Sequence, residues 1–131
     1  QLEASLRATI DKISPETLVG AQSRKAVCDV VAFLYQNFRN PEMSLQMVAD
    51  KLFLNPSYVS RAFHEDTDES FVEALTRLRM EEAIRLLKTT TLCGYEIGER
   101  VGIKDAKYFG ACFKKYTGRT LPEYRRESNQ K

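Results

Sequence analysis

The chain has 131 residues, 43% hydrophobic and 29% charged, which is typical of a folded domain and unlike a disordered segment. Its net charge is only +2, and it contains neither a signal-peptide pattern nor an apolar run long enough for a membrane span. Three scattered cysteines, Cys28, Cys93 and Cys112, and the single His64 fit no zinc or disulfide pattern, so we expect a reducing cytosol, no metal and no cofactor.

Residues 1–22 are predicted to form a leading helix and a connector. Leu2, Leu6, Ile10 and Ile13 recur at helical spacing, and residues 14–17 (SPET) form an N-cap signal. The spacing is compatible both with a dimer seam and with docking on the chain's own domain. Residues 20–23 (GAQS) are the favoured joint before a domain at residues 23–131.

Three amphipathic helices are predicted between residues 23 and 68. The first ends at residues 39–42 (RNPE), the second follows a Ser44 N-cap, and the third starts at Pro56 after a break at residues 53–55. Each helix is apolar on one face. The apolar residues are Val27, Val30, Val31, Leu34 and Phe38; Leu45, Val48, Ala49 and Leu52; and Tyr58, Val59, Ala62 and Phe63.

A long helix is predicted from residue 70 to residue 88, opened by a capping box at residues 70–73 (SFVE). It has two apolar stripes, which indicate packing between two bodies. One stripe contains Phe71, Leu75, Leu78 and Leu86, and the other Met80, Ala83, Ile84 and Leu87. Strand-like alternation occurs nowhere in the sequence, so the chain is predicted to be all-α.

An internal repeat links residues 48–68 with residues 97–118, provided that the second copy has one extra residue in its turn. VADKL at 48–52 matches IGERV at 97–101, and YVSRAF at 58–63 matches YFGACF at 108–113. Ala49 and Gly98 are small where two helices must approach. Each copy is a helix, a tight turn and a helix, the arrangement whose second helix enters the major groove of DNA.

Four stretches resemble the C-terminal DNA-binding domain of the AraC/XylS family of bacterial transcription regulators: SLQMVADKLFLNPSYVSRAF, FVEALTRLRMEEAIRLLKTT, YEIGERVGIKDAKYF and FKKYTGRTLPEYRR. The resemblance implies about seven helices in two helix-turn-helix units, at residues 44–68 and 95–118, bridged by the linker helix at 70–88. It also implies an asymmetric site on double-stranded DNA, with two recognition helices in successive major grooves. The linker would span roughly 28 Å, compared with about 34 Å for one turn of DNA.

This version of the domain is similar to those that follow the receiver domains of response regulators. We therefore expect a regulatory domain upstream of Gln1. RNA polymerase is a further candidate partner. A homodimer, formed through the N-terminal segment or the missing domain, is another.

Exposed positions of the two recognition helices are the candidate DNA contacts. In the first helix they are Ser57, Ser60 and Arg61, and in the second Lys107, Gly110, Ala111, Lys114 and Lys115. Arg61 suits bidentate donation to guanine, and the alternative is a surface pair with Glu65. The lysines suit phosphate contacts. Solvated hydroxyls and a solvated basic face are the alternatives for the serines and lysines.

Other prominent side chains are assigned to structure. The aromatic residues Tyr58, Phe63, Tyr108, Phe109 and Phe113 are expected in the core, and Cys112 is expected to pack there without redox chemistry. Leu75, Leu78 and Arg79 are expected to be structural residues of the linker; the resemblance supports an ion-pair role for Arg79.

The sequence departs from the family at three places. Asp68 replaces a Gly, residues 64–66 (His-Glu-Asp) replace a Lys-led segment, and Gly110-Ala111 replaces a Ser-Arg pair. Charge is also uneven, because residues 42–69 contain two Lys/Arg against six Asp/Glu and residues 104–131 contain eight against three. These features leave open a helical protein-interaction module without specific DNA binding. An enzyme is not expected, since no phosphate loop, metal set or catalytic triad is apparent.

Overall fold

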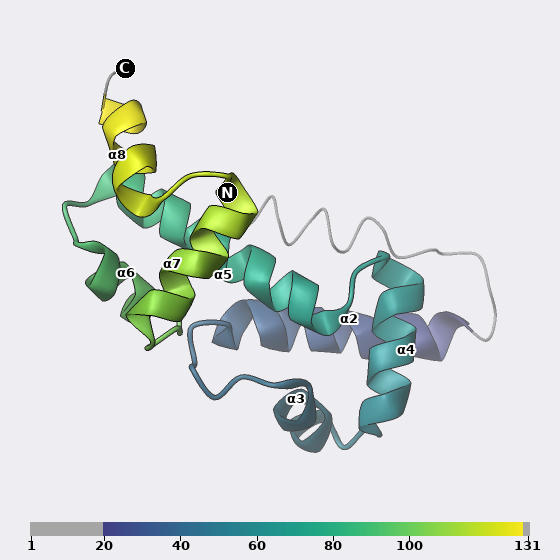
Figure 1. Cartoon of the computed structure of the whole chain (residues 1–131). Coiled ribbons are helices and arrows are strands. Elements are labelled where there is room, and N and C mark those ends of the chain that lie inside the picture. Colours follow the sequence, from purple (N-terminus) through teal and green to yellow (C-terminus); the bar gives the residue numbers. More distant parts are fainter. Residues whose placement is uncertain (1–19, 130–131) are drawn as a thin grey trace. The chain divides into compact units, whose positions relative to one another are not determined.

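The computed structural model describes the backbone of residues 20–129 and the side chains of residues 24–128. This part of the chain contains seven α-helices and no strand, so the all-α prediction is confirmed (Figure 1). The leading helix predicted from Leu2, Leu6, Ile10 and Ile13, and the cap at residues 14–17, lie outside the described residues. The helices are α2 (Gly20–Asn37), α3 (Leu45–Leu52), α4 (Pro56–Thr67), α5 (Phe71–Thr89), α6 (Gly94–Arg100), α7 (Ala106–Thr117) and α8 (Leu121–Asn129).

The joint favoured at residues 20–23 is wrong, because α2 already begins at Gly20. Ala21 and Gln22 are strong helix formers, and no Pro follows to interrupt the helix. The expected domain start at residue 23 therefore lies within α2. The other predicted helix boundaries agree with the structure within about one or two residues, the ordinary scatter of helix ends.

The described residues form two compact units. The first unit comprises residues 20–38 and 42–78, and the second comprises residues 39–41 and 79–129. In the first unit, α2, α3, α4 and the start of α5 enclose a core that includes the fully buried Phe38 and Phe63. In the second, the rest of α5 packs with α6, α7 and α8 around Phe109 and Phe113.

The apolar residues of α5 are divided between the two cores by their position along the helix and not by the face on which they lie. Phe71, Ala74, Leu75 and Leu78 belong to the first core, and Met80, Ala83, Leu86 and Leu87 belong to the second. The predicted packing of this helix between two bodies is therefore confirmed, but the bodies do not take one stripe each, because Leu86 belongs to the second core. Leu86 shares a helix face with Leu75, but it lies about 16 Å further along the helix axis, beyond the reach of the first core.

The two caps predicted for the first unit, at Ser44 and at residues 70–73, are present, and the structure adds one at Asn55. The Ser44 hydroxyl accepts from the Met47 N–H at 3.1 Å, and the Asn55 side chain caps α4 next to Pro56. At the start of α5, Ser70 N–H donates to the Glu73 carboxylate at 2.8 Å, and Glu73 N–H donates to Ser70 Oγ at 3.1 Å. Hydrogen bonds from the backbone N–H and the side chain of Ser70 lower the pKa of the Glu73 carboxyl group. Each helix start is therefore specified locally.

A buried carboxylate organises the second unit. Glu82 is 2% exposed and accepts from Arg39 Nη2 at 2.6 Å and from Arg85 Nε at 2.5 Å. Burial raises the pKa of Glu82, but the hydrogen bonds and charges of Arg85 and Arg39 outweigh burial and lower it. Arg79 donates to the Asn40 carbonyl at 2.9 Å. These contacts hold residues 39–41 against α5. The sequence patterns predict no role for Glu82.

Candidate nucleic-acid interface

The turns of the two helix-turn-helix units have the same hydrogen bonds. Leu54 N–H donates to Ala49 O at 2.8 Å, and Ile103 N–H donates to Gly98 O at the same distance, 2.8 Å. The caps Asn55 and Asp105 then start the two recognition helices. The extra residue expected in the second turn is Lys104, which separates Ile103 from Asp105. The structural repeat therefore matches the one read from the sequence.

Close helix contact in each unit requires a small residue in its first helix. Ala49 is completely buried. A Cβ added to Gly98 would lie 3.0 Å from both the Ile103 carbonyl oxygen and the Phe109 ring, closer than such contacts normally occur. A small side chain is therefore a steric requirement where α6 meets α7, and the matching Ala49 of α3 is enclosed in the first core.

The recognition helices also end in the same way. The Thr67 hydroxyl donates to Phe63 O at 2.7 Å, and the Thr117 hydroxyl donates to Phe113 O at 2.8 Å. The next residue is left-handed in both copies, Asp68 with φ 60° and Gly118 with φ 81°. Asp tolerates this conformation better than most residues with a side chain, which explains how Asp68 stands where the family has Gly.

One face of α4 is buried and the opposite face is free to approach a ligand. Val59, Ala62 and Phe63 are buried, whereas Ser57, Ser60 and Arg61 are exposed. Among the described residues no ion pair joins Arg61 to Glu65, the alternative considered for this arginine. The three predicted residues thus share one accessible face of the helix.

The corresponding face of α7 carries lysines and, between them, two residues with little or no side chain. Lys107, Ala111, Lys114 and Lys115 are exposed and Gly110 is partly exposed, whereas Phe109 and Phe113 are buried. Nothing lies within 4 Å of the position that a Cβ on Gly110 would occupy. The five residues predicted for this helix are therefore on its accessible side, with small side chains between lysines.

Tyr108 was expected in the core, and this expectation is wrong. Its side chain is 60% exposed, whereas the equivalent Tyr58 is partly buried against the first core. Phe63, Phe109 and Phe113 are buried as expected. A hydrogen bond with Cys112 raises the pKa of Tyr108, and Cys112 itself packs against the second core. Helical spacing places Tyr108 on the same side of α7 as Phe109 and Phe113, but it does not show that Tyr108 lies at the exposed edge of that side.

The end of α4 is acidic, as the departure at residues 64–66 indicated. His64 and Glu65 are exposed, and Asp66 Oδ2 is buried without a hydrogen-bond partner among the described residues. Burial, with a contribution from Glu65, raises the pKa of Asp66. Acidic groups at a helix C-terminus oppose the helix dipole and repel phosphate. This end of the recognition helix is poorly suited to a DNA backbone.

The two units differ in net charge. Residues 20–38 and 42–78 contain five Lys/Arg and eight Asp/Glu, a net charge of −3. Residues 39–41 and 79–129 contain twelve Lys/Arg and seven Asp/Glu, a net charge of +5. Long-range attraction to a polyanion therefore comes from the second unit.

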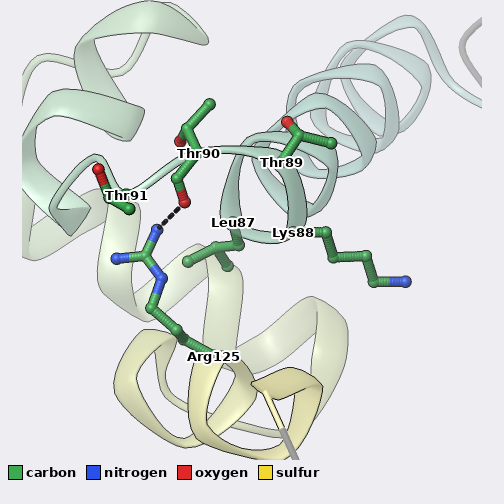
Figure 2. A pocket seen from close by; sticks show the side chains of 6 residues that line it. All are labelled: Leu87, Lys88, Thr89, Thr90, Thr91 and Arg125. Carbon is green, nitrogen blue, oxygen red and sulfur yellow. Dashed lines mark hydrogen bonds between the residues drawn. The ribbon is translucent and has the colours of Figure 1, made fainter. Parts of the chain in front are cut away.

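A hollow of about 770 Å³ lies in the second unit, between the end of α5 and α8. Figure 2 shows Arg125 reaching from α8 to the Thr90 carbonyl, to which it donates at 3.3 Å, while Lys88 extends away from Arg125. The hollow is also lined by Leu87, Thr89 and Thr91. Its two basic groups do not converge, as they would in a small-molecule site. Arg125 instead attaches α8 to the segment after α5.

Among the described residues, no group of three or more His, Cys, Asp and Glu side chains could hold a metal ion. Within the same residues, none of the helices has the length and apolar character needed to cross a membrane.

Comparison with known proteins decides the family. A family model described as a helix-turn-helix domain matches residues 48–127, more than half of the chain. The C-terminal domain of the two-component response regulator yesN from Fusobacterium nucleatum subsp. nucleatum ATCC 25586 is 35% identical, with a TM-score of 0.72 over 73% of this chain and 93% of that one. The chain belongs to the AraC-type helix-turn-helix family. The resemblance seen in the sequence is thereby confirmed.

Two other relatives are similar to this chain in sequence or in fold. The transcriptional regulatory protein YesN of Bacillus subtilis (strain 168) is 38% identical over 104 residues, 77% of this chain but 28% of YesN. The DNA-binding domain of AdpA, solved in complex with a target DNA, has a TM-score of 0.75 at 20% identity, over 80% of this chain and 94% of that one, and shows the shared fold. The chain thus spans less than a third of its curated relative YesN.

Proposed function

We propose that this chain binds double-stranded DNA sequence-specifically and regulates transcription. The observation that carries the proposal is the pair of recognition helices, α4 and α7. Each is fixed by the same turn and the same end contacts, and each exposes a polar or basic face. An exposed face on a helix that is held by a preceding helix and turn is the arrangement that reads a major groove.

The DNA site is proposed to be asymmetric, with two segments centred about 10 base pairs, one helical turn, apart. Asymmetry follows because the two recognition helices of one chain carry different side chains. The expected base contacts come from Arg61, with Ser57 and Ser60, and the expected phosphate contacts come from Lys107, Lys114 and Lys115.

We assign most sequence information to the first segment and most salt-sensitive affinity to the second. Arg61 carries a forked donor that suits guanine, but it lies in a unit with a net charge of −3. The second unit has a net charge of +5 and lacks a long polar side chain at Gly110 and Ala111. Base contacts and phosphate contacts are thus weighted differently in the two units.

Selection from random-sequence duplex DNA, followed by binding isotherms at several salt concentrations, tests the proposal. We expect an enriched asymmetric motif with two segments. A single palindromic core bound by two chains, with one segment per chain, would contradict the proposed arrangement. Failure to enrich any motif, even at low salt, would contradict specific DNA binding altogether.

The acidic first unit favours a second candidate function, a helical module that binds another protein. Its net charge of −3 is unusual for a surface that approaches phosphate. Failed DNA selection together with a partner that requires the α4 face would support this candidate. The family to which the chain belongs consists of regulator domains rather than enzymes.

For the whole protein, we propose a cytoplasmic response regulator of which this chain is the C-terminal, DNA-binding part. Support comes from the yesN domain of Fusobacterium nucleatum, 93% of which aligns with this chain. An upstream receiver domain, contact with RNA polymerase and homodimerisation belong to the same proposal. Reconstituted transcription with and without phosphorylation of the full-length protein tests it.

A further inference from the structure

The two recognition helices carry different residues at the centre of the accessible face. Arg61 lies two positions after Val59 and two before Phe63, both of which are buried. At about 100° per residue, Arg61 therefore points roughly 160° away from each of them. By the same geometry, Ala111 is the residue opposite the buried Phe109 and Phe113. The position that presents a guanidinium in α4 presents only a methyl group in α7.

The surroundings of Ala111 allow close approach to a base. Ala111 is exposed, and nothing occupies the space within 4 Å of a Cβ on the adjacent Gly110. Lys107 and Lys114 are also exposed and lie about one turn before and after Ala111. With one cation on each side of a small apolar centre, the helix can lie deep in the major groove while the two lysines neutralise phosphates.

Among the four bases, only thymine presents a methyl group in the major groove, and an alanine methyl is a suitable contact for it. We propose that α7 recognises a thymine through its 5-methyl group, which packs against Ala111. The inference rests on the proposed DNA-binding function and specifies the chemistry of its second segment. Arg61 would recognise guanine by hydrogen bonds, whereas Ala111 recognises thymine by apolar contact.

The first experiment removes only the thymine methyl. Each thymine of the selected site is replaced in turn by deoxyuridine, which keeps base pairing, and binding is measured with the full chain. We expect one thymine in the second segment to weaken binding about fourfold when its methyl is lost, the effect of one buried methyl-sized group. Replacing that thymine with cytosine should also weaken binding, and 5-methylcytosine should restore part of the loss.

Protein variants connect this effect to Ala111. Ala111→Gly should make the thymine and deoxyuridine sites bind equally, with folding checked by thermal unfolding. Ala106→Gly, at the exposed first residue of the same helix, is a matched control that should keep the difference. Ala111→Arg keeps helix propensity and should change the base selected at this position to guanine.

The outcomes separate this inference from the broader proposal. If no DNA site is enriched, both are wrong. If a site with two segments is enriched but deoxyuridine binds as well as thymine throughout the second segment, only the thymine contact is wrong. A methyl effect that persists in Ala111→Gly, or an unchanged base preference in Ala111→Arg, would also overturn the assignment to Ala111.

Discussion

The first helix-turn-helix unit turns at Phe53, whereas the second turns at Gly102. Both residues are left-handed, with φ 58° and 96°, and both donate to the residue three positions earlier, Asp50 and Glu99, at 3.3 and 3.2 Å. A left-handed conformation costs a residue with a side chain roughly 1–2 kcal/mol, but costs glycine little. The Phe53 ring is 93% exposed, so this cost lies in the backbone and not in the packing of the ring.

The comparison shows which features a repeated unit must keep. The backbone bonds of the turn, the small residue before it and the threonine at the helix end are matched, because each closes the local structure. The exposed centre of the recognition helix differs completely, Arg61 in one unit and Ala111 in the other. Positions facing inward are fixed by packing, and positions facing outward are free to encode different partners.

The largest expected effect comes from removing one ring from either core. Phe63→Ala and Phe113→Ala should each lower the free energy of unfolding by about 3–5 kcal/mol, because both rings are completely buried. Urea unfolding measures the loss. Tyr108→Ala, which removes an exposed ring from α7, is the control and should change stability by less than about 0.5 kcal/mol. A small effect of Phe113→Ala would contradict the equivalence of the two cores.

The buried Glu82 distinguishes the second unit under acid conditions. Its folded pKa lies below the usual 4.5, so its contribution to stability is present above about pH 4.5 and is lost as the pH falls through the folded pKa. Glu82→Gln should cost about 1–2 kcal/mol at neutral pH, because it weakens hydrogen bonds to half-exposed arginines. Unfolding measured from pH 7 to pH 3 should show less acid sensitivity in the variant. Equal pH dependence in both proteins would show that Glu82 is not the group responsible.

Arg61→Ala tests the chemical difference between the recognition helices. We expect a loss of about 1–3 kcal/mol in binding free energy and relaxed specificity at one position of the first segment. Isotherms on the selected site and on scrambled DNA measure the loss. Equal weakening on both DNAs would assign Arg61 to phosphate rather than to a base.

Left-handed positions in the two units can be tested by substitution. Phe53→Gly should raise the free energy of unfolding by about 1 kcal/mol, because it relieves the backbone conformation without removing a packed side chain. Gly118→Ala should lower it by about the same amount, although its Cβ would meet nothing within 4 Å. Thermal unfolding of both variants checks the signs. Destabilisation by Phe53→Gly would mean that the ring makes a stabilising contact.

The smallest effect is expected for Lys114→Ala. Loss of one phosphate contact should weaken binding to all sequences alike and should flatten the slope of log K against log salt by about one unit at most. The isotherms of the Arg61 experiment, repeated at several salt concentrations, provide the measurement. A change in base preference without a change in slope would reverse the roles given to Arg61 and Lys114.

The sequence by itself determined most of the helices, two of their caps and the repeat. Ser44 and the Ser70–Glu73 box act through neighbours a few positions away, so local patterns were sufficient to predict them. The one-residue insertion, Lys104, followed from matching the two copies of the repeat. The accessible faces of α4 and α7 also followed from helical periodicity. The predicted DNA-contact residues share those faces, and their roles stay predictions until binding is measured.

Only the tertiary structure decided how side chains at the margin of a face are used. Periodicity gives an angle around the helix, but burial also depends on which neighbouring helix lies at that height. For this reason Leu86 belongs to the second core, Tyr108 is exposed although Tyr58 is partly buried, and Glu82 is enclosed between Arg39 and Arg85. Arg39 is 43 positions from Glu82, and a contact at that separation exists only once the chain has folded.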